Sequence, residues 1–169
     1  VYDEPCAQHT LALIAGHARQ LIAASINQRG PRAWPQESLR QGSRLMGGQT
    51  VMLFGFGSIA RRLVALLAPL GMTVIGVRRK VVGDEPVRTL ASDDPCVFDV
   101  LGAADHVVNL LPGSRTTRHY FGARQFKAMK RGAAFYNIGR GTTVDQDALN
   151  DALSDHLSGA YLDVSDPEP

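Results

Sequence analysis

The chain has 169 residues, of which 44% are hydrophobic, and a formal net charge of +2. This size and composition favour one domain with one core, and the basic residues form no long run interleaved with aromatic residues, which argues against a nucleic-acid-binding protein. No apolar run reaches the roughly 18 residues of a membrane span, and Cys6 and Cys96 form no C-x-x-C pair, so we expect no membrane segment, metal site or disulfide and a cytoplasmic location.

Residues 1–30 predict one long leading helix. The acidic residues and the proline at positions 3–5 are typical of a first helical turn. One face repeats at helical spacing through Ala7, Leu11, Ile14, Ala18, Leu21, Ile22 and Ser25. Residues 30–48 are rich in Arg, Gln, Gly and Ser, so we expect an ordered loop there, anchored by Trp34.

Residues 50–80 predict a strand, a glycine-rich turn, a helix and a second strand. The turn matches the dinucleotide-binding fingerprint G-x-G-x-x-G/A with Gly55-Phe56-Gly57-Ser58-Ile59-Ala60. The first glycine permits a tight turn and the second lets the backbone approach a pyrophosphate, towards which the helix amides from Ser58 onward would point. A glycine turn that binds nothing is the alternative. It is disfavoured by the helical repeat of Ile59, Leu63, Leu66, Leu67 and Leu70.

The remaining sequence alternates strand and helix patterns. We expect, in order, a short strand at 87–90, a helix at 95–102, a strand at 105–112 ended by Pro112, a helix at 124–130, a strand at 133–138, a helix capped by Asp145 and a strand at 159–164. Such alternation predicts an α/β fold with a doubly wound parallel sheet, the Rossmann-type dinucleotide-binding domain.

Ligands of such sheets bind beyond the carboxyl ends of the strands. The residues at those positions are 55–59, Arg78 and Arg79, Leu111 and Pro112, 138–140 and Asp163. Arg140 stands between two glycines, where a guanidinium could clamp a small carboxylate; the alternative is a surface arginine in a turn. Glu168 could polarise an acid–base partner, although an acid between two prolines is usually only solvated. His106 and His119 are weak candidates for that partner.

Several motifs together carry a family resemblance. In chain order they are residues 6–14, residues 45–51, the glycine turn, Leu110-Leu111-Pro112 with Thr117, residues 137–141 with Val144-Asp145 and Ala148-Leu149, and Leu162-Asp163-Val164 with Glu168-Pro169. The chain resembles the NAD(P)-binding domain of the D-isomer-specific 2-hydroxyacid dehydrogenases, which include glyoxylate/hydroxypyruvate reductases and phosphoglycerate dehydrogenases. The resemblance implies reduction of a small 2-oxo acid by hydride transfer.

The resemblance also implies roles for individual residues. Arg140 would bind the substrate, and Glu168 would pair with a catalytic histidine. The implied cofactor contacts are Gly55, Phe56, Gly57, Ser58, Ile59, Arg78, Arg79, Leu111, Pro112, Thr117, Ile138, Gly139 and Asp163, the last of which would hold the nicotinamide carboxamide. The leading helix would help to form a homodimer.

The sequence departs from the family pattern in two places. No histidine within residues 1–169 matches the catalytic one, which follows the Glu-Pro pair in the family, and the substrate domain would be built mainly from residues ahead of Val1. The expectation is therefore one NAD(P)-binding domain without its substrate domain. The other departure is Arg78, which stands at the end of the second strand where NAD-using relatives carry an acid. Because an arginine there accommodates a 2′-phosphate, we expect NADP to be preferred, with NAD possible.

Two other interpretations stay open. The chain could be a non-catalytic dinucleotide-binding or dimerisation module, although such a module needs neither Arg140 nor Glu168. It could instead bind S-adenosylmethionine, although the cations at positions 78–80 argue against this, since those sites usually carry an acid at the second strand.

Overall fold

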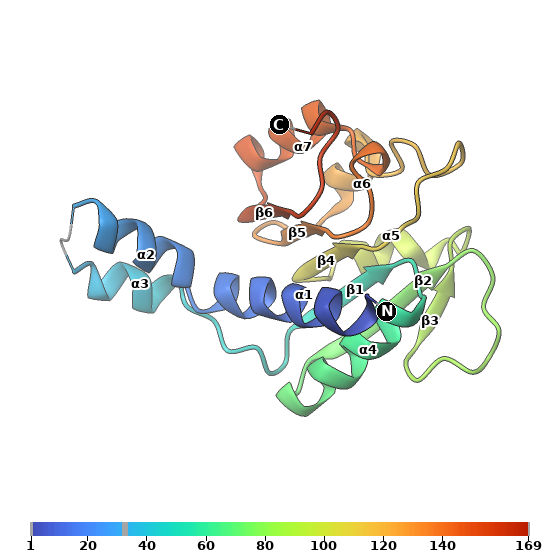
Figure 1. Cartoon of the computed structure of the whole chain (residues 1–169), viewed down its shortest axis with the longest axis horizontal. Coiled ribbons are helices and arrows are strands. Elements are labelled where there is room, and N and C mark those ends of the chain that lie inside the picture. Colours follow the sequence, from blue (N-terminus) through green and yellow to red (C-terminus); the bar gives the residue numbers. More distant parts are fainter. Residues whose placement is uncertain (1, 32–33, 169) are drawn as a thin grey trace.

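The computed structural model describes residues 2–31 and 34–168. The α-helices are α1 (Asp3–Ala18), α2 (Leu21–Arg29), α3 (Gln36–Gly42), α4 (Ser58–Leu67), α5 (Cys96–Leu101), α6 (Ala123–Ala128) and α7 (Gln146–Asp155). The strands are β1 (Thr50–Phe54), β2 (Thr73–Arg78), β3 (Thr89–Ala91), β4 (His106–Asn109), β5 (Ala134–Asn137) and β6 (Gly159–Leu162), and two short 3₁₀ helices are η1 (Ala68–Leu70) and η2 (Gly141–Thr143). Figure 1 shows their arrangement.

The strands form one six-stranded sheet in the order β3-β2-β1-β4-β5-β6. Every neighbouring pair is parallel. The first strand, β1, therefore lies at the centre of the sheet. The strands β2 and β3 extend the sheet to one edge, and β4, β5 and β6 extend it to the other. This confirms the doubly wound parallel sheet predicted from the sequence.

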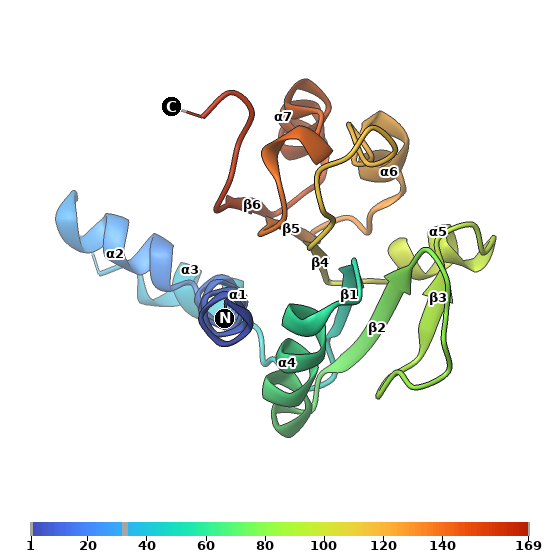
Figure 2. The same ribbon diagram turned by 45° about the vertical axis from the view of Figure 1, so that its right-hand side comes forward.

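Alternating side chains of the strands build a core on each face of the sheet. In β1, Val51 and Leu53 contribute to the cluster beneath α1 and α4, whereas Met52 and Phe54 contribute to the cluster with α5, α6 and α7. Figure 2 shows these two groups of helices on opposite sides of the sheet. Because both faces are covered, the strands are apolar runs without polar alternation.

The prediction of one long helix over residues 1–30 is wrong. The chain breaks after Ala18, and Gln20 adopts a left-handed backbone with a φ of 56° before α2 begins. On one side of the break α1 packs against the sheet and buries residues such as Ala7 and Ile14. None of the residues of α2, all of which are described, is buried. The apolar repeat continues through the break, so periodicity could not reveal it.

The predicted loop at 30–48 contains a short helix, α3, and the predicted anchoring role of Trp34 is also wrong. Its side chain is 83% exposed. Helices α2 and α3 together project from the sheet as an arm (Figure 1). The exposed large apolar residues of this arm are Leu21, Ile22, Ile26 and Trp34.

The later elements lie close to their predicted positions. The strand expected at 105–112 is shorter, because β4 ends at Asn109 and Pro112 lies beyond it in the following loop. The predicted cap is confirmed, since the Asp145 carboxylate accepts a hydrogen bond from the amide of Ala148 at 3.1 Å. Among the described residues, no helix is long and apolar enough to cross a membrane.

Candidate functional site

The glycine-rich turn joins β1 to α4 at the carboxyl edge of the sheet. Gly55 has a φ of +96°, and a Cβ at this position would lie 2.7 Å from the carbonyl oxygen of Leu110, so the turn runs directly against the chain leaving β4. A Cβ on Gly57 would meet no described atom within 4 Å. The open space beside Gly57 and the first amides of α4 therefore fit a bulky anionic group such as a pyrophosphate.

Phe56 fills the gap between the two glycines with a buried side chain. Its ring packs on Gly76 of β2, where a Cβ would lie 2.4 Å from the Phe56 ring. Only the backbone of Phe56 is therefore left to face a ligand. Cζ of Arg61 lies over the Phe56 ring, 5.9 Å from its centroid.

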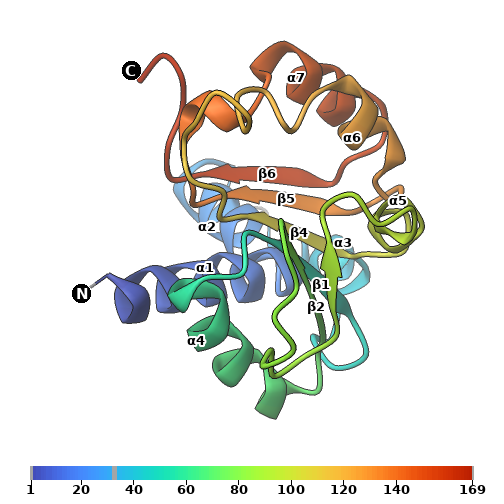
Figure 3. The ribbon, with the colours of Figure 1, turned by 90° about the vertical axis from the view of Figure 1, so that its right-hand side faces the viewer.

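The chain segments after β4 and β5 continue the same edge. A Cβ on Gly139 would lie 2.6 Å from the carbonyl oxygen of Leu111, and one on Gly113 would lie 3.4 Å from Cγ of Arg140. The segment that follows β4 thus contacts both the segment that follows β1 and the segment that follows β5. In Figure 3 the first turn of α4 and the segment after β6 lie at this same end of the strands.

Three buried polar side chains connect the segments that follow these strands, and none of them was predicted as a site residue from the sequence. Asn109 donates to Oδ1 of Asn137 at 2.8 Å and to Oγ1 of Thr143 at 2.6 Å. Asn137 accepts from the amide of Gly139 at 3.2 Å, while Thr143 donates to the carbonyl of Arg140 at 2.6 Å. The signal was present, because β4 and β5 are apolar runs that each end in Asn. This cluster holds the backbone of Arg140 in place.

The Arg140 side chain itself is exposed, and Nη1 donates to the carbonyl of Gly139 at 2.7 Å. Asp163, directly after β6, lies 3.6 Å from Nε2 of His9 on α1. Thr117 donates to the carbonyl of Pro112 at 2.6 Å and so closes the loop after β4. Arg140 and Asp163 thus sit at the predicted edge, at the ends of neighbouring strands.

The other predicted residues are spread along this edge with different exposures. Ser58 is exposed, Ile59 and Leu111 are half-buried, and Ile138 and Gly139 are buried. Glu168 is exposed in the segment after β6. Of the histidines considered, His106 lies at the start of β4, on the opposite edge, as predicted.

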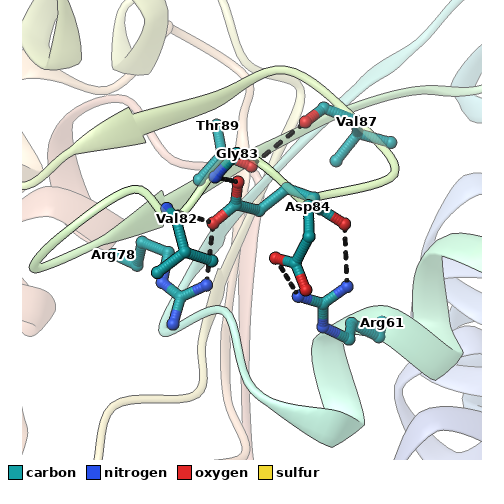
Figure 4. A network of polar contacts seen from close by, with 8 residues as sticks. Arg61, Arg78, Val82, Gly83, Asp84, Val87 and Thr89 are labelled. Atoms are coloured by element: carbon teal, nitrogen blue, oxygen red, sulfur yellow. Dashed lines mark hydrogen bonds and ion pairs between the residues drawn. The ribbon is translucent and has the colours of Figure 1, made fainter.

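The end of β2 differs from the expectation that it carries cations without an acid. Arg79 and Lys80 are exposed, but Nη1 of Arg78 donates to Oε1 of Glu85 at 2.7 Å (Figure 4). The loop between β2 and β3 thus places the carboxylate of Glu85 at the end of β2. The pairing of Arg78 with a residue seven positions further on left no signal in the sequence pattern.

The opposite edge of the sheet carries a second polar network. His106 contacts the hydroxyl of Tyr136 at 2.9 Å and Oε1 of Gln49 at 2.5 Å, and its ring lies 6.0 Å from that of His17. His17 contacts the hydroxyl of Tyr161 at 2.9 Å. Burial, and to a lesser degree the nearby His17, lowers the pKa of His106 to about 4. This network holds α1 on the sheet and lies away from the candidate site.

The close approach at Gly55 makes a testable prediction. We expect Gly55→Ala to lower the free energy of unfolding by about 2 kcal/mol, because an L residue is strained at this φ and its Cβ would press on the Leu110 carbonyl. Gly48→Ala is the matched control, since Gly48 has a φ of +83° but no described atom within 4 Å of a Cβ. Urea unfolding measures both; an equal loss in the two variants would contradict the clash.

The parallel sheet and the glycine turn at its switch point define a Rossmann-type dinucleotide-binding domain. A family model described as "D-isomer specific 2-hydroxyacid dehydrogenase, NAD binding domain" matches residues 11–169. The chain belongs to this family, which confirms the resemblance drawn from the sequence.

Individual relatives agree with this assignment. The chain is 31% identical over 174 residues to a glyoxylate reductase of Aeropyrum pernix, covering 100% of this chain and 52% of the relative. The crystal structure of phosphoglycerate dehydrogenase from Lactobacillus plantarum aligns with a TM-score of 0.90 at 36% identity, covering 100% and 54% of the two chains. A 2-hydroxyacid dehydrogenase from Xanthobacter autotrophicus in complex with NADPH and MES aligns with a TM-score of 0.86 at 29% identity, covering 99% and 51%. The chain thus spans about half the length of these relatives.

Proposed function

We propose that this chain is the cofactor-binding domain of an oxidoreductase that reduces a small 2-oxo acid of the glyoxylate/hydroxypyruvate class to the D-2-hydroxy acid. The observation that carries the proposal is the position of Arg140. Its exposed guanidinium follows β5 on the same sheet edge as the glycine turn, two strands away. A dinucleotide seated on the turn would extend along this edge and bring its reactive ring towards Arg140.

The residues divide into two groups in this proposal. Gly55 shapes the turn, because its amide donates to the carbonyl of Val77 at 2.9 Å. Phe56, Gly57, Ser58 and Ile59 hold the pyrophosphate through backbone amides, and Leu111, Pro112, Thr117, Ile138, Gly139 and Asp163 line the remainder of the dinucleotide. The bound nicotinamide would supply the hydride. Arg140 clamps the carboxylate of the oxo acid, and Glu168 orients an acid–base group from outside residues 1–169.

For the cofactor we propose a preference for NADP over NAD. Arg78 and Arg79 stand at the end of β2, where the adenosine ribose is recognised in this fold, and a cation there attracts a 2′-phosphate. The NADPH complex of the Xanthobacter relative is consistent with a family that accepts this cofactor.

The double variant Arg78→Ala, Arg79→Ala tests the preference. We expect NADPH affinity to fall about tenfold and NADH affinity to stay within about twofold, because only NADPH carries the phosphate that the cations attract. Fluorescence titration of the complete gene product with both cofactors gives the ratio. Wild-type protein that binds the two equally, or prefers NADH, would contradict the proposal. Turnover of glyoxylate or hydroxypyruvate in the same preparation tests the reaction.

A second role is favoured by the exposed apolar residues of the α2–α3 arm. The leading segment 1–30 was expected to help to form a homodimer. We propose that the arm, which begins in this segment with α2 and continues through α3, forms the homodimer interface. Four large apolar side chains on it lie in solvent, including Trp34 at 83% exposure. A protein that dimerised in light scattering but bound neither dinucleotide would instead fit the non-catalytic module.

A further inference from the structure

We propose that Glu85 sets the cofactor preference of this domain by competing with the 2′-phosphate of NADP for Arg78. The inference rests on the proposed binding of a dinucleotide beside the end of β2. It makes Glu85, a loop residue outside the glycine fingerprint, a residue that determines specificity.

The geometry shows a carboxylate fastened at the strand end. Oε1 of Glu85 accepts from Nη1 of Arg78 at 2.7 Å and from the amide of Val82 at 3.0 Å, while Oε2 accepts from the amide of Gly83 at 2.8 Å. The Glu85 side chain is 3% exposed, and that of Arg78 is 27% exposed. Figure 4 shows Val82 and Gly83 of the loop beside the Arg78 guanidinium. The loop amides thus hold the Glu85 carboxylate in contact with Arg78, the last residue of β2.

The same hydrogen bonds keep this carboxylate charged. The amide of Val82, the guanidinium of Arg78 and the amide of Gly83 together lower the pKa of Glu85 to about 2, against the opposing effect of burial. A full negative charge therefore stands at the end of β2 at neutral pH. In Rossmann domains that bind NAD, an acid at the end of the second strand accepts hydrogen bonds from the ribose hydroxyls, and such a charge repels a 2′-phosphate.

Glu85 consequently places an acidic side chain at the end of β2, although the strand itself does not end in an acidic residue. It occupies the Nη1 donor of Arg78, and its charge opposes the phosphate. Arg79 and Lys80 are exposed and keep their attraction for the phosphate. The balance places the preference for NADP near tenfold, at the lower end of what a pair of free arginines would produce.

The loop offers a matched control in the neighbouring acid. Oδ1 of Asp84 accepts from Nη2 of Arg61 on α4 at 2.8 Å, and the two side chains are 69% and 38% exposed. Figure 4 shows Asp84 paired with Arg61, to the right of Arg78. Asp84→Asn removes the same charge from the same loop without freeing Arg78, so it separates competition for Arg78 from a general change in charge.

The experiment titrates NADPH and NADH into the complete gene product as wild type, Glu85→Gln and Asp84→Asn, at low and high salt. We expect Glu85→Gln to raise the ratio of NADPH to NADH affinity about tenfold, and Asp84→Asn to change it by less than about twofold. The gain should shrink in high salt because the partly exposed phosphate is screened.

Each other outcome overturns the inference. An unchanged ratio in Glu85→Gln would mean that Glu85 only fastens the loop, a lower ratio would mean that it holds Arg78 ready for the phosphate, and an equal rise in Asp84→Asn would mean that loop charge alone acts. Should Glu85→Gln fail to fold, Glu85→Ser removes the same charge and leaves space for water to accept from the loop amides. Wild-type protein that binds neither dinucleotide would overturn the proposed function itself, whereas a ratio insensitive to Glu85 leaves that function intact.

Discussion

Replacing Arg140 by Ala in the complete gene product should lower catalytic efficiency about a hundredfold or more while cofactor affinity stays within about threefold. If Arg140 binds the substrate carboxylate as proposed, this charge-assisted bidentate contact would contribute on the order of 3 kcal/mol, which corresponds to this factor. The fold should survive, because the side chain is exposed and its hydrogen bond goes to the carbonyl of the adjacent Gly139. The backbone of Arg140 remains held by Thr143.

Steady-state kinetics with glyoxylate and hydroxypyruvate measure this effect, and dinucleotide titration measures the affinity. Arg140→Lys is the matched control: it keeps the charge but loses the planar fork, so its loss should fall between wild type and Arg140→Ala. A change in catalytic efficiency of less than about threefold for Arg140→Ala would show that the guanidinium does not meet the substrate.

Acid should destabilise the domain through His106. The folded pKa of about 4 lies below the ordinary value of 6.5, so the unfolded chain binds the proton more tightly. The stability that the neutral imidazole contributes is therefore complete above pH 6.5 and is lost as the pH falls towards 4. At pH 4 the loss in free energy of unfolding should reach about 3 kcal/mol, since one pKa unit corresponds to about 1.4 kcal/mol.

Urea unfolding followed by circular dichroism between pH 4 and pH 7 checks this expectation. Trp34 is a poor reporter, because its side chain is already exposed in the folded state. Carboxylates also titrate in this range, so the relevant quantity is the difference between wild type and His106→Gln, whose stability should depend less on pH. His119→Asn, which changes an exposed histidine at the other edge, should retain the wild-type dependence. Parallel curves for wild type and His106→Gln would refute the assignment.

The fold follows closely from local sequence patterns. The apolar run before Gly55 predicted β1, the helical repeat after Ser58 predicted α4, and Asp145 predicted the start of α7. Each of these depends on residues adjacent in sequence or one helical turn apart. The interval between the strands then favoured parallel pairing, because a helix fills every crossover except the loop between β2 and β3.

Local pattern failed where one residue altered the backbone or where distant residues met. Nothing in the repeat of residues 1–30 distinguishes Gln20, yet its left-handed conformation separates a packed helix from an exposed one. The sequence has no acidic residue at the end of β2, and this predicted a site with cations alone. The prediction was wrong for the site, because the loop after β2 brings Glu85 into contact with Arg78.

The sequence by itself thus determined the parallel sheet, the glycine turn and the edge at which Arg140 and Asp163 stand, because backbone preferences and apolar periodicity act over a few residues. The tertiary structure alone decided which polar groups meet. Asn109 and Asn137 come from different strands, and His17 reaches Tyr161 across 144 positions. Such pairs form only after the sheet brings their strands together, since the hydrogen bonds of buried polar groups are satisfied by neighbours in space rather than in sequence.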